Sequence, residues 1–108
     1  MSTTLAACGG GDIGSSPNGV TLYRYAGSVQ CTGGGLTLAD MNMQLTNAGV
    51  LVYSASCGSD GYIHAGGCGS PDGRIGIFEV PTSQAQAASA LGFAPLSGLP
   101  YAFKTSCP

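Results

Sequence analysis

The chain has 108 residues, of which 44% are hydrophobic and only 7% are charged. This length predicts one domain, and the charged fraction is far below the quarter that is typical of globular proteins. The three cations, Arg24, Arg74 and Lys104, are scattered along the chain. Because nucleic-acid binding needs clustered cations, the composition argues against a nucleic-acid partner.

The first motif along the chain is Leu5-Ala6-Ala7-Cys8, which is followed by three glycines. It resembles the lipobox of bacterial lipoproteins, and the resemblance implies lipidation at Cys8 and a membrane anchor. The residues before it hold neither the basic nor the apolar region of a signal peptide, so we expect a leader upstream of Met1. Residues 1–19 are interpreted as a lipobox remnant and a flexible Gly/Ser/Pro tether. Residues 20–108 are interpreted as one domain.

The first half of this domain predicts a strand, a helix and a second strand. Residues 20–25 alternate and are rich in aromatic and β-branched side chains, which favours a strand. Thr37 and Asp40 have the spacing of a capping box that begins a helix. Gly49 is placed to end that helix, and residues 50–53 predict the second strand. The helix would bury an apolar stripe made of Leu38, Met41, Leu45 and Ala48.

The second half predicts the same order of elements after a Gly-rich connection at residues 57–73. Residues 74–80 form an apolar strand pattern that stops at Pro81. Ser83 and Gln86 have capping-box spacing ahead of an alanine-rich helix that Gly92 would end. Residues 93–96 predict a short strand, which its proline confines to a sheet edge. The last residues, 97–108, are expected to form a tail.

The order of these elements is βαββαβ, which predicts an α+β fold. We expect a ferredoxin-like split βαβ sandwich, with an antiparallel sheet and both helices on one face.

Five cysteines in so short a chain indicate disulfides in an oxidising compartment. With Cys8 assigned to lipidation, Cys31, Cys57, Cys68 and Cys107 remain, and three pairings are open to them. Cys57 and Cys68 flank the connection between the second and third strands, so we favour Cys57–Cys68. Cys31–Cys107 then follows and would fasten the tail to the domain.

Few residues indicate catalysis or metal binding. His64 is the one histidine, and Cys57 and Cys68 flank it, so a small thiol- or metal-dependent enzyme that uses these three residues is an alternative. Disulfide bonding of both cysteines would remove the thiolate. Met41 and Met43 would suit copper, but Met41 lies on the apolar stripe, where packing is its usual role. We therefore expect no enzyme activity, no cofactor and no metal.

Two resemblances extend over the body of the chain. Segments such as Cys57-Gly58-Ser59-Asp60-Gly61 and Ala90-Leu91-Gly92-Phe93 are similar to small uncharacterised exported proteins of proteobacteria. A more distant likeness, in the Arg74–Phe93 half, is to SPOR domains, which share the βαββαβ order and bind peptidoglycan glycan strands. The first resemblance implies a location in the Gram-negative envelope and no catalysis, and the second implies glycan binding.

The sequence thus favours an exported, non-enzymatic lipoprotein domain that binds an envelope protein or glycan. SPOR-like glycan binding and the small enzyme remain alternatives. A self-assembling structural subunit is the third, because a surface with few charges resists association poorly. We expect a monomer or a weak homo-oligomer.

Overall fold

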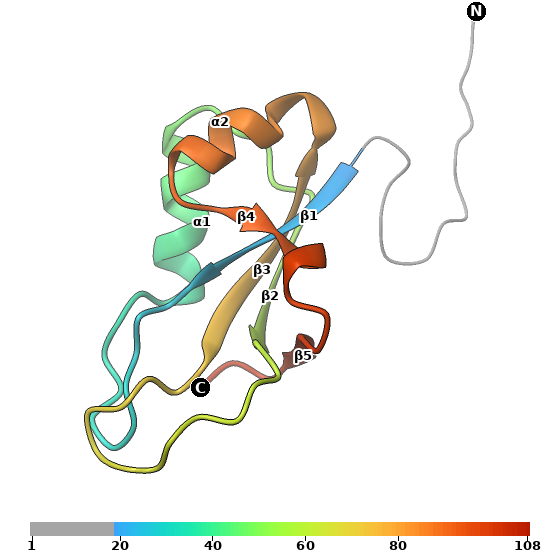
Figure 1. Cartoon of the computed structure of the whole chain (residues 1–108). Coiled ribbons are helices and arrows are strands. Elements are labelled where there is room, and N and C mark those ends of the chain that lie inside the picture. The colour runs from blue at the N-terminus through green and yellow to red at the C-terminus, as the bar shows by residue number, and fades with distance from the viewer. Residues whose placement is uncertain (1–18) are drawn as a thin grey trace, which may run out of the picture.

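Five antiparallel strands form one sheet in the computed structural model, which describes residues 19–108 (Figure 1). Their order across the sheet is β4-β1-β3-β2-β5, so β3 lies in the middle between β1 and β2. The α+β class and the antiparallel sheet are confirmed. The strands are β1 (Gly19–Tyr25), β2 (Ser54–Ser59), β3 (Arg74–Pro81), β4 (Ala94–Pro95) and β5 (Phe103–Thr105).

Two α-helices, α1 (Leu38–Asn47) and α2 (Ala85–Ala90), accompany the sheet. The capping box at the start of α1 is confirmed: the Thr37 side chain accepts from the Asp40 N–H, and the Asp40 carboxylate accepts from the Thr37 N–H. Both helices end at a glycine with positive φ, Gly49 and Gly92, as predicted. At each end, two successive N–H groups bond back to carbonyls of the last turn, which is the Schellman arrangement.

The capping box predicted for α2 is wrong. A 3₁₀ turn, Thr82–Gln84, leads into the helix, and no side chain caps its first turn. The Gln84 side chain instead accepts from the Leu51 N–H at 2.7 Å and donates to the Gly49 carbonyl at 3.3 Å. It therefore satisfies backbone groups after α1, a tertiary contact that local spacing does not reveal.

The second strand also differs from the prediction. Residues 50–53 are a connection and not a strand: the Val50 N–H bonds to the Leu45 carbonyl at the end of α1, and Tyr53 lies in a bend. Only at Tyr53 does an N–H reach β3, through the Glu79 carbonyl at 2.7 Å. The strand itself is the stretch of small residues that follows. There Gly58 is required, because a Cβ would lie 2.7 Å from the backbone carbonyl oxygen of Phe103.

The main core lies between the helices and one face of the sheet. Figure 1 shows both helices on the same side, and buried residues of both belong to one apolar cluster with the sheet. Phe78 and Phe93, both almost fully buried, meet edge to face with ring centroids 5.5 Å apart. This cluster contains Leu22, Ala26, Met41, Leu45, Val50, Phe78, Val80, Ala88 and Phe93.

The chain after β4 covers the other face of the sheet. A second buried cluster forms there from Ile75 and Ile77 of β3 and Leu99 of the C-terminal segment. Leu96 and Ala102 pack against it from the same segment. The chain then returns as β5, which pairs with β2. The predicted tail is thus a structural layer and adds a fifth strand to the four expected.

We expect Thr37→Ala to lower the free energy of unfolding by about 1 kcal/mol, because it removes the hydrogen-bond acceptor of the α1 cap. Thr32→Ala, which truncates an exposed threonine in a loop, is the matched control and should change stability by less than about 0.5 kcal/mol. Urea unfolding measures both. Equal effects of the two substitutions would contradict the capping role of Thr37.

Candidate functional site

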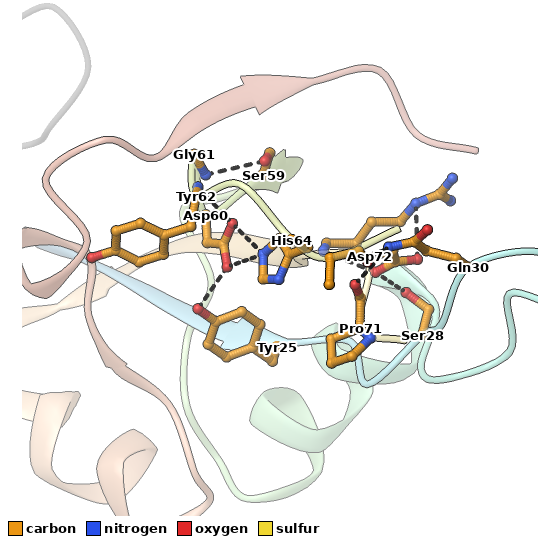
Figure 2. A network of polar contacts seen from close by, with 12 residues as sticks. Tyr25, Ser28, Gln30, Ser59, Asp60, Gly61, Tyr62, His64, Pro71 and Asp72 are labelled. Carbon is orange, nitrogen blue, oxygen red and sulfur yellow. Dashed lines mark hydrogen bonds and ion pairs between the residues drawn. The ribbon is translucent and has the colours of Figure 1, made fainter. Parts of the chain in front are cut away.

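A buried carboxylate organises the end of the sheet where β2 finishes. Asp60 follows β2 directly and is fully buried. Figure 2 shows Tyr25, Tyr62 and His64 around it. Asp60 accepts from the Tyr25 hydroxyl at 2.9 Å, from the Tyr62 N–H at 3.0 Å and from His64 Nε2 at 2.9 Å. An ionised carboxylate can only accept hydrogen bonds, so His64 is the donor, through Nε2.

These contacts shift the acid–base behaviour of the cluster. Burial raises the pKa of Asp60, but the hydrogen bonds from Tyr62, His64 and Tyr25 outweigh burial and hold the pKa below its usual value. Burial, together with the hydrogen bond to Asp60 and its negative charge, raises the pKa of Tyr25 to about 12. Asp60 is therefore ionised and Tyr25 neutral over the physiological range.

A second polar network joins the loop after β1 to the loop before β3. Asp72 accepts from the Ser28 hydroxyl at 2.8 Å and from the Arg74 N–H at 3.0 Å, and its other oxygen lies 3.4 Å from Arg74 Nε. Gln30 holds the same two loops together: its side chain donates to the Ala65 and Pro71 carbonyls. The two loops therefore form one unit beside α1 (Figure 2).

Two disulfides crosslink the described domain, but their pairing differs from the one that the sequence favoured. The bonds are Cys31–Cys68 and Cys57–Cys107, and not Cys57–Cys68 with Cys31–Cys107. The Cα atoms of the partners lie 5.1 and 5.2 Å apart. Two intramolecular disulfides are consistent with an oxidising, extracytoplasmic compartment.

Backbone pairing explains the first bond. Gln30 accepts from the Gly69 N–H at 3.2 Å and donates its own N–H to the Ser70 carbonyl at 2.8 Å. These bonds place Cys31, which follows Gln30, beside Cys68, which precedes Gly69. Cys31 adopts a φ of +75°, which is unusual for a residue other than glycine.

Strand pairing explains the second bond. Cys57 lies within β2, opposite Thr105 of β5. Cys107 follows two residues later and so reaches Cys57. The wrong prediction assumed that residues 57–73 form a connection that closes on itself, whereas β2 extends through Cys57 to Ser59.

A cleft of about 920 Å³ opens between the start of α1, the loops that Asp72 joins, and the C-terminal segment after β5. Apolar side chains line it from several elements, among them Ala26, Leu36, Leu38 and Met41. Its polar groups are few: Ser28, Asp72 and Arg74 lie at one side, and the Cys57–Cys107 disulfide lies at the other. The Arg74 side chain is 52% exposed, so its guanidinium remains available to a ligand.

The structure does not bring the proposed catalytic residues together as a thiol site. Cys57 and Cys68 belong to different disulfides, and His64 bonds to Asp60. In the described residues, no group of three or more His, Cys, Asp or Glu side chains is placed to hold a metal ion. Met41 is buried in the core, and Met43 is exposed on α1. Cys8, the predicted lipidation site, lies outside the described residues.

No protein-family model, curated protein or solved structure matches this chain. Within residues 19–108, the helices are too short or too polar to cross a bilayer.

The sequence singled out His64 but neither Asp60 nor Tyr25, which organise the cluster. Asp60 does have a local signal. Its side chain accepts from the N–H of Tyr62, two residues later, and this arrangement is an Asx turn. The contact with Tyr25 spans 35 positions and has no local signal. The Ser28–Asp72 contact spans 44 positions and was missed for the same reason.

We expect Asp60→Asn to lower stability near neutral pH by about 1–3 kcal/mol, because the amide cannot accept all three hydrogen bonds. The pKa of Asp60 is lower in the folded protein, so its contribution is present at neutral pH and is lost as the pH falls and the carboxylate is protonated. The free energy of unfolding, measured with urea, should therefore fall less between about pH 5 and pH 2 for the variant than for the wild type. Parallel pH profiles would contradict this role.

The disulfide pairing predicts the thiols of two double variants made in a Cys8→Ser background. Cys31→Ser with Cys68→Ser should leave no reactive thiol in the unreduced protein, because Cys57–Cys107 remains intact. Cys57→Ser with Cys68→Ser should leave two, because Cys31 and Cys107 each lose their partner. Thiol titration with a chromogenic disulfide counts them, and the reverse result would restore the pairing that the sequence favoured.

Proposed function

We propose that this protein is a non-enzymatic binding module of the Gram-negative cell envelope, tethered through a lipid on Cys8. Its domain would hold an envelope protein or a glycan in the cleft beside α1. The observation that carries the proposal is that cleft. Its volume, about 920 Å³, is within the range of natural ligand sites, and it combines apolar walls with a few polar groups.

The proposed location is supported by the cysteines. The four cysteines of the described domain are all in disulfides, which form and persist in oxidising compartments. This leaves Cys8 as the odd cysteine of the chain, at the position where the lipobox resemblance places the lipid. The Gly- and Ser-rich residues 9–19 would then separate the domain from the membrane.

We also propose the ferredoxin-like split βαβ topology for the core of the fold. The order β4-β1-β3-β2 supports it, because β1 and β2 are separated by β3 and connected through α1. In this interpretation β5 is an addition at the β2 edge. The same order favours SPOR-like glycan binding as the second candidate function.

The remaining alternatives have less support. A thiol enzyme would need a thiolate at Cys57 or Cys68, and both sulfurs are in disulfides. A self-assembling subunit would show an oligomer in sizing experiments across concentration, whereas the binding module can act as a monomer.

The cleft can be tested by filling it. Ala39 is an exposed residue of α1 that lines the cleft, and Ala87 is an exposed residue of α2 that does not. We expect Ala39→Trp to weaken capture of an envelope protein, or of soluble peptidoglycan glycan fragments, by about tenfold, which is about 1.4 kcal/mol. Ala87→Trp, with the same change of side chain, should bind like the wild type.

Envelope extracts and purified glycan fragments are applied separately to the immobilised protein, and affinities are measured for whichever is retained. Retention of neither by the wild type would contradict the binding function. Equal binding by the two tryptophan variants would place the partner outside the cleft.

A further inference from the structure

We propose that the Cys57–Cys107 disulfide is a redox latch on the cleft, which a dithiol opens before it reduces Cys31–Cys68. Opening the latch would release residues 103–108 and remove one wall of the cleft. The inference rests on the proposed function in one respect, since it takes the cleft as the binding site. It adds regulation of that site by the thiol–disulfide balance around the protein.

The end of the chain depends on the latch for its position. β5 contains three residues, pairs with β2 alone and has three exposed side chains, so it offsets little of the conformational entropy that its ordering costs. Residues 106–108 follow outside any helix or strand, and the disulfide attaches them to β2. Before β5, Ala102 packs against the buried cluster that contains Leu99. Release would therefore stop at Ala102 and free residues 103–108.

The other disulfide joins two loops that hydrogen bonds hold together without it. Gln30 makes five hydrogen bonds to residues 65–71 of the opposite loop, two through its backbone and three through its side chain. The left-handed φ of Cys31 belongs to a turn that two hydrogen bonds between Val29 and Gly33 close, so reduction does not relieve it. After reduction the two thiols would stay side by side at a high effective concentration, and the bond would form again.

The exposed partner of the latch gives a reductant its point of attack. Cys107 is exposed, whereas Cys57 is partly buried in β2. A thiolate of the dithiol attacks Cys107 Sγ, forms a mixed disulfide there and displaces Cys57 as a thiolate. The second thiol of the dithiol then attacks the sulfur of the first and releases Cys107. The dithiol becomes a disulfide, and its two electrons and two protons pass to the two cysteines.

Release of the segment would change the cleft directly. The walls that come from α1 and from the loops around Asp72 belong to segments that opening the latch leaves in place. A ligand that contacts both sides of the cleft would bind the oxidised protein more tightly than the reduced one. The wall that would be lost consists of Thr105, Ser106, Cys107 and Pro108.

Stepwise reduction tests the latch without a ligand. The full unlipidated chain with Cys8→Ser is treated with increasing dithiothreitol, its thiols are alkylated, and mass spectrometry locates them. We expect Cys57 and Cys107 to be alkylated at about tenfold lower dithiothreitol than Cys31 and Cys68. Simultaneous reduction of the two bonds, or earlier reduction of Cys31–Cys68, overturns the proposal.

Trypsin then reports whether the segment is released. Three residues of the chain are Lys or Arg, and one of them, Lys104, lies in β5. The latch variant, Cys57→Ser with Cys107→Ser, should be cut after Lys104 about tenfold faster than its parent. The matched control, Cys31→Ser with Cys68→Ser, should be cut there like the parent. The two arginines lie in β1 and β3, and unchanged cleavage after them shows that a variant is folded. Equal cleavage after Lys104 in the two variants overturns the proposal.

Failure of the latch and failure of the proposed function give different results. A wild type that captures neither an envelope protein nor a glycan contradicts the binding function, whereas the order of reduction and the trypsin cleavage decide the latch alone. Where the wild type captures a partner, the latch variant should bind it about tenfold more weakly and the control variant should bind normally. Equal capture by the two variants would show that the latch does not regulate the cleft.

Discussion

A carboxylate without access to solvent must find its hydrogen-bond donors inside the protein, and Asp60 finds them in β1 and in its own loop. The backbone of the same residue bonds to Gly73, just before β3. Gly73 has a φ of +77° and lies so near the cluster that a Cβ would be 2.6 Å from His64 Nε2. One buried group thus constrains β1, the loop after β2 and the start of β3, and the cleft is lined by residues that adjoin these segments, Ala26, Ser59 and Arg74.

The rest of the stability comes from covering both faces of a small sheet. The helices cover one face, and the C-terminal segment covers the other with Leu99. A domain of this size buries only a modest core, and each disulfide adds roughly 2–4 kcal/mol. The two bonds act where packing is thin: Cys31–Cys68 joins two glycine-rich loops, and Cys57–Cys107 holds the short edge strand β5.

Features that depend on neighbouring residues could be predicted from the sequence, and features that depend on distant residues could not. The Thr37 cap, the glycine ends of both helices and the strand at residues 74–80 follow from local rules and are present. The strand predicted at residues 50–53 is absent: the Val50 N–H bonds to the end of α1, and the Leu51 N–H bonds to Gln84, 33 positions away. The disulfide pairing was wrong because it required the register of β2 with β5. The Asp60 cluster joins Tyr25 to a loop 35 residues away, so only its Asx turn was visible locally.

The Cys57–Cys107 bond fixes one side of the cleft to which we assign binding. Cys57 and Cys107 both line the cleft, and so does Thr105 of β5, the strand that the bond holds. β5 is three residues long and pairs with β2 alone, so little else fixes its position. Reduction of this bond would free the C-terminal segment that forms one wall of the cleft. The cleft therefore needs the oxidising compartment in which we propose to place the protein, whereas the Asp60 cluster, built without cysteine, does not.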